Sequence, residues 1–591
     1  MPGLGDAARR GSAPVLALAL LAWPPAPAQA FLDSLNPFTD TKDQFEGRYI
    51  DTFEPEPWKP PLERLAAERA AADSRAGRRR GGGRLGEGDD YDDEPAVRAE
   101  PRPPPDPIPD GLTLLRISED SVASAPGWEG YLNDIGARLL AGAPITGAPV
   151  RFYVTASEDY GSAKAFPDGP VGIPVGLLRK VASEDELAFI LGHEASHVLL
   201  GHHDSDWFQS MNQSLVTAAE MALGLGVALS EKLGQGGLAK DAAKIAIIAT
   251  GALFVADKGL FPSFTREQED EADLLGLDLM IGAGYNSQGA IDSFGNLQAW
   301  EAKVAARPSA QAQQRSKLEA EIGQSANRGN FDAAIQGVLK MFFLAVDEVA
   351  DDISVSHRSA LAREESLLDY FFREYAEDIP PDSSAMRLEA VRNDPEGQAL
   401  FGSYQQARDA ITKVDEGKLA EAEKLARGAV GGRFKNDSLA RYAFYRTRWQ
   451  QGNIGKAQKN LELALEGPRP SLAVYRELAE IHWTQGRRKE AMEVLEAAFE
   501  AFQKPPELYA DLVYRHYLLG DKKKANELAI KCKFRNRGAG KVCGKAAKGE
   551  SPRLAKGKAH AGAPGQRSPG HGSPAKAREQ KPQKGRGAKP Q

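Results

Sequence analysis

The sequence feature that most constrains the fold is a repeat in the C-terminal third of the chain. Four glycines recur there at nearly equal spacing: Gly417, Gly452, Gly486 and Gly520. An alanine stands five positions after each glycine: Ala422, Ala457, Ala491 and Ala525. Glycine permits a tight turn between helices, and a small residue on the next helix lets neighbouring helices approach closely. The pattern therefore predicts a stack of helical hairpins.

A period of about 34 residues with small side chains at these positions is typical of tetratricopeptide repeats. We expect residues 401–537 to form an α-solenoid of three or four such repeats, because stacking buries a continuous core. The concave face of a solenoid can bind client or assembly-machinery proteins. An unrelated helical bundle is the alternative, and the four in-phase glycine–alanine pairs argue against it.

Residues 1–30 have the features of a secretory signal peptide. Arg9 and Arg10 precede an apolar run from Val15 to Trp23, and Ala28-Gln29-Ala30 supplies a cleavage site of small residues. This run is far shorter than the roughly 20 residues that span a membrane. We therefore expect a mature chain without a transmembrane helix, exported to the periplasm if the source is a bacterium.

Composition divides the rest of the chain. Residues 31–53 contain aromatic and apolar positions and are expected to form a short segment that docks elsewhere. Residues 54–110 are rich in Pro, Arg, Gly and acidic side chains, which predicts a disordered linker. A periodic apolar pattern over 111–400, with a strand expected at 150–154, predicts an α+β, mainly helical domain. Residues 538–591 are expected to be a basic disordered tail.

The formal net charge of −7 conceals an uneven distribution. Residues 531–591 carry 17 Lys and Arg against two Glu, a net charge of +15, so the preceding residues carry −22. The tail would be attracted to an anionic envelope surface, or simply be solvated, and an exported chain rarely meets nucleic acid. The only two cysteines, Cys532 and Cys543, could form a disulfide that closes the last repeat in an oxidising compartment.

The motif with the clearest chemistry lies in the 111–400 domain. His193-Glu194-Ala195-Ser196-His197 has the H-E-x-x-H pattern, inside a stretch (Asp185–Leu200) whose apolar spacing predicts a helix. Histidines at i and i+4 share one helical face and suit two corners of a tetrahedral zinc site. Glu194 can take a proton from water and pass it to the leaving amine. Two surface histidines without a metal are the alternative.

A zinc site of this type needs a third protein ligand. Glu269 and Asp273, in an acidic run from Thr265 to Gly276, stand at i and i+4 and share a helical face. Glu269 can complete a His-His-Glu set for one zinc ion per chain, while Asp273 can hold the free ring nitrogen of a ligating histidine. Taken alone, the acidic run would also fit a solvated helix face.

The two motifs together resemble the gluzincin family that includes the CaaX prenyl protease and the HtpX-type heat-shock proteases. Flanking segments also agree: Glu184–Ala188 before the first motif and Ala283–Asn286 after the second. The resemblance covers most of the domain and implies a zincin-type metalloprotease fold that acts on protein or peptide substrates. It also implies that Glu269, rather than Glu267 or Glu271, is the third zinc ligand.

Two further segments resemble the same family. Residues 165–169 are similar to its upstream edge strand, which places substrate, although Lys164 stands where the family has Asn. Residues 356–363 are similar to its H-P-x-x-x-x-R segment, with Arg358 in place of Pro. By that match His357 would approach the zinc, either to stabilise the oxyanion or as a plug that keeps the resting enzyme inactive. A histidine with no role at the zinc is the alternative.

Residues 214–264 contain two apolar stretches, Val216–Leu229 and Ile245–Ala256, separated by a polar, Gly-rich stretch. Each is shorter than a membrane span. A buried helical hairpin fits this pattern, and so does a mobile or membrane-touching flap that gates the active site.

Signal peptide, peptidase domain and C-terminal repeats together are similar to periplasmic members of the family that act in outer-membrane quality control. We therefore expect an exported zinc metalloendopeptidase that cleaves misfolded or misassembled envelope proteins, with the repeats recruiting clients. The alternative is a chaperone-like assembly scaffold with a latent zinc site. Glu194 favours the enzyme, because a scaffold has no evident need for it.

Overall fold

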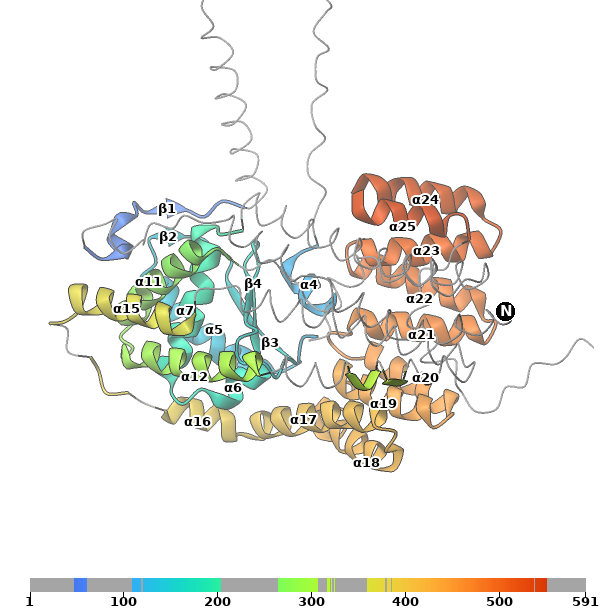
Figure 1. Cartoon of the computed structure of the whole chain (residues 1–591), viewed down its shortest axis with the longest axis horizontal. Helices are drawn as coiled ribbons and strands as arrows, with labels where there is room; N and C mark the ends of the chain where they lie inside the picture. The colour runs from blue at the N-terminus through green and yellow to red at the C-terminus, as the bar shows by residue number, and fades with distance from the viewer. Residues whose placement is uncertain are drawn as a thin grey trace, which may run out of the picture.

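A computed structural model describes the larger part of the chain. The described residues are 47–60, 109–117, 121–203, 264–306, 359–377, 380–383, 385–535 and 537–549, with a few more between 316 and 324. The expected signal peptide, most of the linker, nearly all of 214–264, His357 and residues 550–591 of the tail lie outside the described residues. Figure 1 shows an α/β half beside a stack of helices.

The α/β half contains a small mixed sheet. Strand β3 (Arg151–Thr155) runs parallel to β5 (Pro170–Pro174), and β4 (Lys164–Ala165) pairs antiparallel with the other side of β5. The expected strand at 150–154 is thus confirmed, one residue later. Helices α5 (Pro126–Ala141) and α6 (Val175–Lys180) flank the sheet. Strand β4 therefore forms one edge of the described sheet.

Helix α7 (Glu184–Leu200) is the centre of this half and confirms the helix expected at 185–200. It begins where the Ser183 hydroxyl accepts a hydrogen bond from the Glu186 amide, and it ends at Gly201, whose φ of 68° suits glycine. Helices α11 (Arg266–Gly282) and α12 (Gln288–Ala305) pack against α7, and α15 (Ala360–Glu374) packs against both of them. Helices α11 and α12 therefore cover α7, and α15 packs on those two helices in turn.

The N-terminal segment docks on the α/β half. The short 3-10 helix η2 (Tyr49–Thr52) packs against α11, and β1 (Glu56–Pro57) pairs with β2 (Ile145–Thr146). For residues 47–53 this agrees with the expectation that the segment 31–53 docks elsewhere, and the described structure continues past residue 53 to residue 60. The reason is that β1 pairs with β2, a strand far later in the chain, and this pairing satisfies backbone groups of residues whose composition predicts a linker.

The helical stack consists of paired helices. The bounds of its helices are α16 (Met386–Asn393), α17 (Pro395–Asp415), α18 (Leu419–Ala429), α19 (Ser438–Gln450), α20 (Ile454–Leu465), α21 (Leu472–Thr484), α22 (Arg488–Ala501), α23 (Pro506–Leu518) and α24 (Lys522–Arg535), with η3 (Gly432–Phe434) before α19. All four repeat glycines have positive φ, from 72° to 83°, and all four alanines are fully buried. The predicted hairpins are confirmed, although α17 starts at Pro395, before residue 401, because Asp394 caps it.

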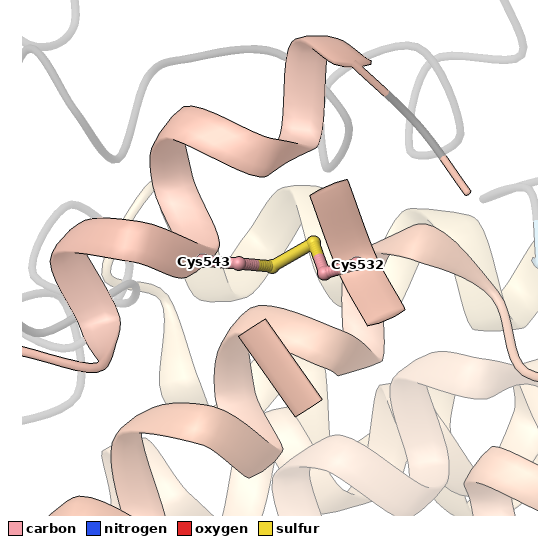
Figure 2. Close-up of a disulfide and its surroundings, with 2 residues drawn as sticks. All are labelled: Cys532 and Cys543. Carbon is pink, nitrogen blue, oxygen red and sulfur yellow. A yellow bond between two sulfur atoms is a disulfide. The ribbon is translucent and has the colours of Figure 1, made fainter. Parts of the chain in front are cut away.

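The end of the stack differs from the expectation of a tail from residue 538. Helix α25 (Arg537–Ala546) packs against α23 and α24, and a disulfide joins Cys532 to Cys543, as Figure 2 shows. Both cysteines are buried. The lysines and glycines of this stretch suggested disorder, but the covalent link and the burial of Cys543 and Ala546 keep it on the stack.

The halves are joined at several places. Helix α4 (Gly111–Ile117) lies between the sheet and α21 (Figure 1), and Arg116 on it donates to the carbonyl oxygen of Pro470 at 3.1 Å. Arg469 forms an ion pair with Glu129 on α5.

Among the described helices, none is both long and apolar enough to cross a membrane.

Candidate metal centre

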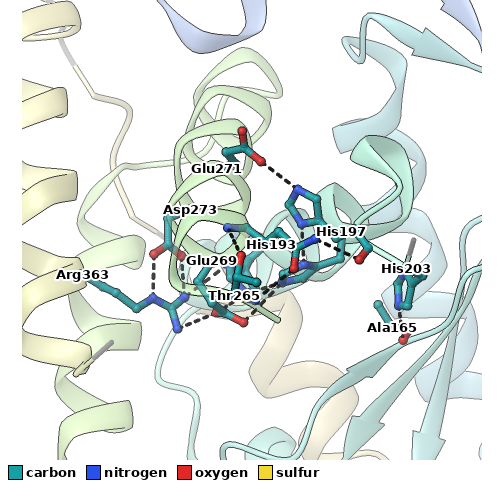
Figure 3. A network of polar contacts seen from close by, with 11 residues as sticks. Ala165, His193, His197, His203, Thr265, Glu269, Glu271, Asp273 and Arg363 are labelled. Atoms are coloured by element: carbon teal, nitrogen blue, oxygen red, sulfur yellow. Dashed lines mark hydrogen bonds and ion pairs between the residues drawn. The ribbon is translucent and has the colours of Figure 1, made fainter. Parts of the chain in front are cut away.

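Three buried side chains converge where α7 meets α11. His193 and His197 lie one turn apart on α7, with their Nε2 atoms separated by 3.2 Å. From α11, Glu269 places one carboxylate oxygen 3.6 Å from Nε2 of His193 and the other 3.8 Å from Nε2 of His197. One ligand atom from each of the three lies within 4.8 Å of the others (Figure 3). This set can hold one metal ion.

Two glycines allow the helices to come this close. A Cβ atom on Gly276 of α11 would lie 2.9 Å from the backbone nitrogen of His193, and one on Gly192 of α7 would lie 3.1 Å from the Gly276 carbonyl oxygen. Backbone atoms cannot move away as a flexible side chain can. Glycine at both positions therefore sets the helix separation that brings Glu269 to the imidazoles.

The other ring nitrogen of His193 is held by a carboxylate. Its Nδ1 lies 2.9 Å from Asp273, which receives two hydrogen bonds from Arg363 on α15 at 2.7 Å and 2.6 Å. Arg363 also lies 2.9 Å from Glu269. Burial would raise the pKa of Asp273, but the charge and hydrogen bonds of Arg363 outweigh it and lower that pKa. The carboxylate thus fixes which nitrogen of His193 carries hydrogen.

The other ring nitrogen of His197 is held by a second histidine. Nδ1 of His197 lies 2.8 Å from Nδ1 of His202, and Nε2 of His202 lies 3.1 Å from Glu271. Phe264 stacks on the His197 ring with centroids 3.7 Å apart. Burial, together with the neighbouring imidazole of His193, holds the pKa of His197 well below its usual value, so this ring is neutral.

The donor set fits a divalent transition metal. Both Nε2 atoms point toward the Glu269 carboxylate, while both Nδ1 atoms have other partners. Two imidazoles and one carboxylate form a recurring zinc-ligand combination in peptidases, and they leave a fourth position for water. Glu194, on α7 between the two histidines, is also buried, with 9% of its surface exposed.

The structure brings together four residues that the sequence singled out: His193, His197, Glu269 and Asp273. His357 lies outside the described residues. Of the neighbouring carboxylates, Glu271 contacts His202 instead of joining the three clustered side chains. The edge-strand segment lies near the end of α7, because the carbonyl oxygen of Ala165 accepts a hydrogen bond from His203 at 3.0 Å.

Sequence reasoning missed the supporting residues. Arg363 is the last residue of the segment 356–363, in which the sequence points only to His357. His202 lies just beyond the C-terminal end of α7. The sequence does show that Arg363 follows His357 by six residues and that His202 follows His197 by five. These spacings do not identify the partners of Arg363 and His202, because the contacts depend on how α7, α11 and α15 pack.

Comparisons with known proteins agree with this geometry. Residues 127–361 match peptidase family M48, and residues 472–515 match the tetratricopeptide repeat. Residues 127–361 are therefore similar to a peptidase M48 domain, and the matched tetratricopeptide repeat follows them in the chain.

Individual relatives carry more specific names. The chain is 28% identical over 211 residues to a β-barrel assembly-enhancing protease of Yersinia pestis, covering 34% of this chain and 38% of that protein. It is 29% identical over 197 residues to a putative β-barrel assembly-enhancing protease of Vibrio cholerae, covering 33% of this chain and 38% of that protein. A third relative, the metalloprotease YcaL of Escherichia coli, is 30% identical over 153 residues, 26% of this chain and 53% of that protein. The match thus spans about two fifths of the first two relatives.

Proposed function

We propose that this protein is an exported zinc metalloendopeptidase that cleaves proteins of a bacterial envelope. The observation that carries the proposal is the buried cluster of His193, His197 and Glu269. In this cluster Nδ1 of His193 contacts Asp273, and Nδ1 of His197 contacts His202. Such an arrangement leaves the Nε2 lone pairs for a metal, which two surface histidines would not do.

The proposed mechanism assigns one task to each residue. When bound, zinc would supply a Lewis acid that polarises the scissile carbonyl and makes water more acidic. His193, His197 and Glu269 would hold it. Glu194 would act as the general base that accepts the proton of the attacking water, and then as the general acid that delivers it to the leaving amine. Asp273 and Arg363 would keep the ring of His193 in its metal-binding orientation.

The substrate would bind beside β4. This strand is the edge of the described sheet, and its Ala165 is linked to the region after α7 through His203. An extended peptide can add to such an edge through main-chain hydrogen bonds, which need no particular side-chain sequence. His357 would either stabilise the oxyanion or plug the resting site.

The repeats would bring clients to this site. The relatives named as β-barrel assembly-enhancing proteases suggest clients among outer-membrane β-barrel proteins that are misfolded or misassembled. The expected periplasmic location and signal peptide fit this role, and the basic tail would add attraction to anionic envelope surfaces. Two halves joined through α4 and Arg469 would keep a bound client close to the peptidase domain.

A proteolysis assay on the purified mature chain tests the proposal. Casein and an unfolded outer-membrane β-barrel protein serve as substrates, before and after removal of metal with a chelator. We expect cleavage of both, loss of cleavage in the chelated protein, and recovery when one equivalent of zinc is added. If the β-barrel protein is bound through the repeats and kept from aggregating but never cut, the assembly-scaffold alternative is correct.

A further inference from the structure

Helix α4 packs on the peptidase sheet with one side and on the repeats with the other. Its buried residues Leu115 and Ile117 are two positions apart, so they point to nearly opposite sides of the helix. Leu115 belongs to a buried cluster with Val122 and Phe166. Ile117 belongs to the buried cluster of the last repeats, which includes Phe502. We propose that α4 positions the substrate-binding edge strand β4 relative to the repeats. The inference rests on the proposed function, since this position matters only if a peptide binds at β4.

The sheet side of α4 is fixed to the segment that directly follows β4. The amide of Gly111, the first residue of α4, donates to both carboxylate oxygens of Asp168, at 3.1 Å and 3.0 Å. Gly111 also has no room for a side chain, because a Cβ atom there would overlap Cβ of Phe166 and lie 2.7 Å from its Cγ. On β5, a Cβ atom on Gly172 would lie 2.8 Å from the Leu115 side chain. A shift of α4 would therefore displace the segment after β4.

The opposite side of α4 is fixed to two loops of the repeats, one before α21 and one after α22. Arg116 donates to the carbonyl oxygen of Pro470 from Nε at 3.3 Å and from a terminal nitrogen at 3.1 Å. Its guanidinium lies over the Phe502 ring, 4.6 Å from the centroid. Just before α4, the amide of Asp110 donates to Oε1 of Gln503 at 3.0 Å, and the side-chain amide of Gln503 donates to the Asp110 carboxylate. The repeats therefore help to set the position of α4.

Strand β4 is thus held from two directions. The carbonyl oxygen of Ala165 accepts a hydrogen bond from His203, which ties β4 to the end of the metal-binding helix α7. The hydrogen bonds from Gly111 to Asp168 tie the following segment to α4, and so to the repeats. A peptide that pairs with an edge strand takes its position from that strand. The repeats would therefore affect the binding of a short peptide at β4, in addition to recruiting large clients.

Matched variants of the full mature chain test the inference, with kcat and KM measured on a short peptide substrate. Asp168→Ala removes the acceptor of the Gly111 amide, whereas Asp168→Asn keeps an oxygen that can accept from it. Arg116→Ala removes the contacts of α4 with Pro470 and Phe502. Zinc affinity, measured by competition with a chelator, separates an effect on the metal centre from an effect on substrate binding.

A further pair of variants changes only the repeats. Gln503→Ala removes the hydrogen bonds with Asp110, and Lys504→Ala is its control. The two residues are neighbours with similar left-handed φ values, 55° and 61°, so alanine is equally strained at both positions. The ion pair of Lys504 with Glu500 is exposed, so its loss should have little effect.

We expect KM for the short peptide to rise about 2–10-fold in Asp168→Ala and in Arg116→Ala, because the effect cannot exceed the net contribution of the lost contacts. Both kcat and zinc affinity should stay unchanged, since the metal ligands and Glu194 are intact and weaker uniform binding raises KM alone. Asp168→Asn should restore most of the loss. Gln503→Ala should raise KM less, because its hydrogen bonds are exposed, and Lys504→Ala should not raise it.

Thermal unfolding identifies any variant that does not fold, and Gln503→Ala, which changes an exposed side chain, then decides. A wild-type KM in folded Asp168→Ala and Arg116→Ala would overturn the inference alone. A rise confined to Asp168→Ala would overturn the link to the repeats. A wild-type chain that cuts neither peptide nor protein would overturn the proposed function and this inference with it.

Discussion

Arg363 on α15 holds Asp273 on α11 through two parallel hydrogen bonds, from Nε at 2.7 Å and from Nη2 at 2.6 Å. Its remaining terminal nitrogen lies 2.9 Å from Glu269. One buried guanidinium therefore contacts both the carboxylate that orients His193 and the carboxylate of the three-residue cluster. This planar fork is a geometry that lysine cannot reproduce.

Replacing Arg363 should destabilise the protein strongly. Arg363→Ala leaves two buried carboxylates without their cation, and breaking a buried ion pair in this way costs about 3–5 kcal/mol. Arg363→Lys keeps the charge but not the fork, so its loss should be smaller. Urea unfolding in the presence of a chelator measures both. Arg427→Ala is the control, because its ion pair with Glu423 is exposed and is worth at most about 1 kcal/mol. Equal losses for Arg363→Ala and Arg427→Ala would contradict the account.

Gly276 should not tolerate a side chain. In Gly276→Ala, the new Cβ would lie 2.9 Å from the His193 nitrogen and 3.1 Å from its Cα, so α11 must move away from α7. We expect a loss of about 1–3 kcal/mol in the free energy of unfolding. Zinc binding should weaken as well, because Glu269 moves with α11.

Gly295→Ala on α12 is the matched control for that change. A Cβ at Gly295 meets nothing within 4 Å, so the substitution should stabilise the helix by up to about 1 kcal/mol. Zinc titration followed by urea unfolding measures both effects. Wild-type zinc affinity in Gly276→Ala would show that the close approach of α7 and α11 does not set the ligand geometry.

Asp278 should make stability depend on pH. Burial raises the pKa of this carboxyl to about 6, although the hydroxyls of Tyr375 and Tyr370, the Ile50 amide and the charge of Arg48 favour its ionised form. The folded carboxyl therefore keeps its proton at a pH where the unfolded one has lost it. Its contribution to stability falls as pH rises from about 4 to about 6, by roughly 3 kcal/mol in total.

Asp278→Asn provides the comparison. The free energy of unfolding of the metal-free wild type, minus that of the variant, should decrease across this pH window, because the other titrating groups are common to both proteins. Chelator is present throughout, so that metal release does not contribute. A difference that stays constant from pH 4 to pH 6 would be inconsistent with a raised pKa for Asp278.

Reduction of the disulfide should release the last helix. Cys532 and Cys543 are 11 residues apart, and closing a loop of this size stabilises a protein by about 2–3 kcal/mol. With a reductant, amide hydrogen exchange should accelerate in α25 and in the end of α24, while α17–α19 stay protected. The Cys532→Ser/Cys543→Ser variant should not respond to the reductant. Unchanged exchange in α25 after complete reduction would argue against this role.

Local patterns were sufficient for much of the fold and for the core of the site. Gly452 and Ala457 indicate a turn and a helix contact that depend only on backbone conformation and side-chain size, so their regular recurrence identifies the hairpins. His193 and His197 share a face because an α-helix completes a turn in slightly less than four residues. The same rule relates Glu269 to Asp273 on α11.

The missing features depend on tertiary packing or covalent chemistry. Arg363 is 90 residues from Asp273 in sequence, and Tyr49 belongs to a segment whose composition gives no partner. Residues 537–546 are rich in lysine and glycine and contain few apolar side chains, so no amphipathic pattern in the sequence predicts α25. Their order depends on a disulfide and on a surface provided by α23 and α24. No short window of sequence contains that information.

The rate of peptide-bond cleavage by Glu194→Gln, at a zinc content equal to that of the wild type, tests the central claim most directly. Glutamine preserves the size of the side chain but cannot accept a proton from water. A missing general base typically lowers the rate about 10²–10⁴-fold. We predict a loss in this range with one zinc ion still bound per chain. Cleavage within a few-fold of the wild-type rate would contradict the assignment of Glu194 and the metallopeptidase mechanism built on it.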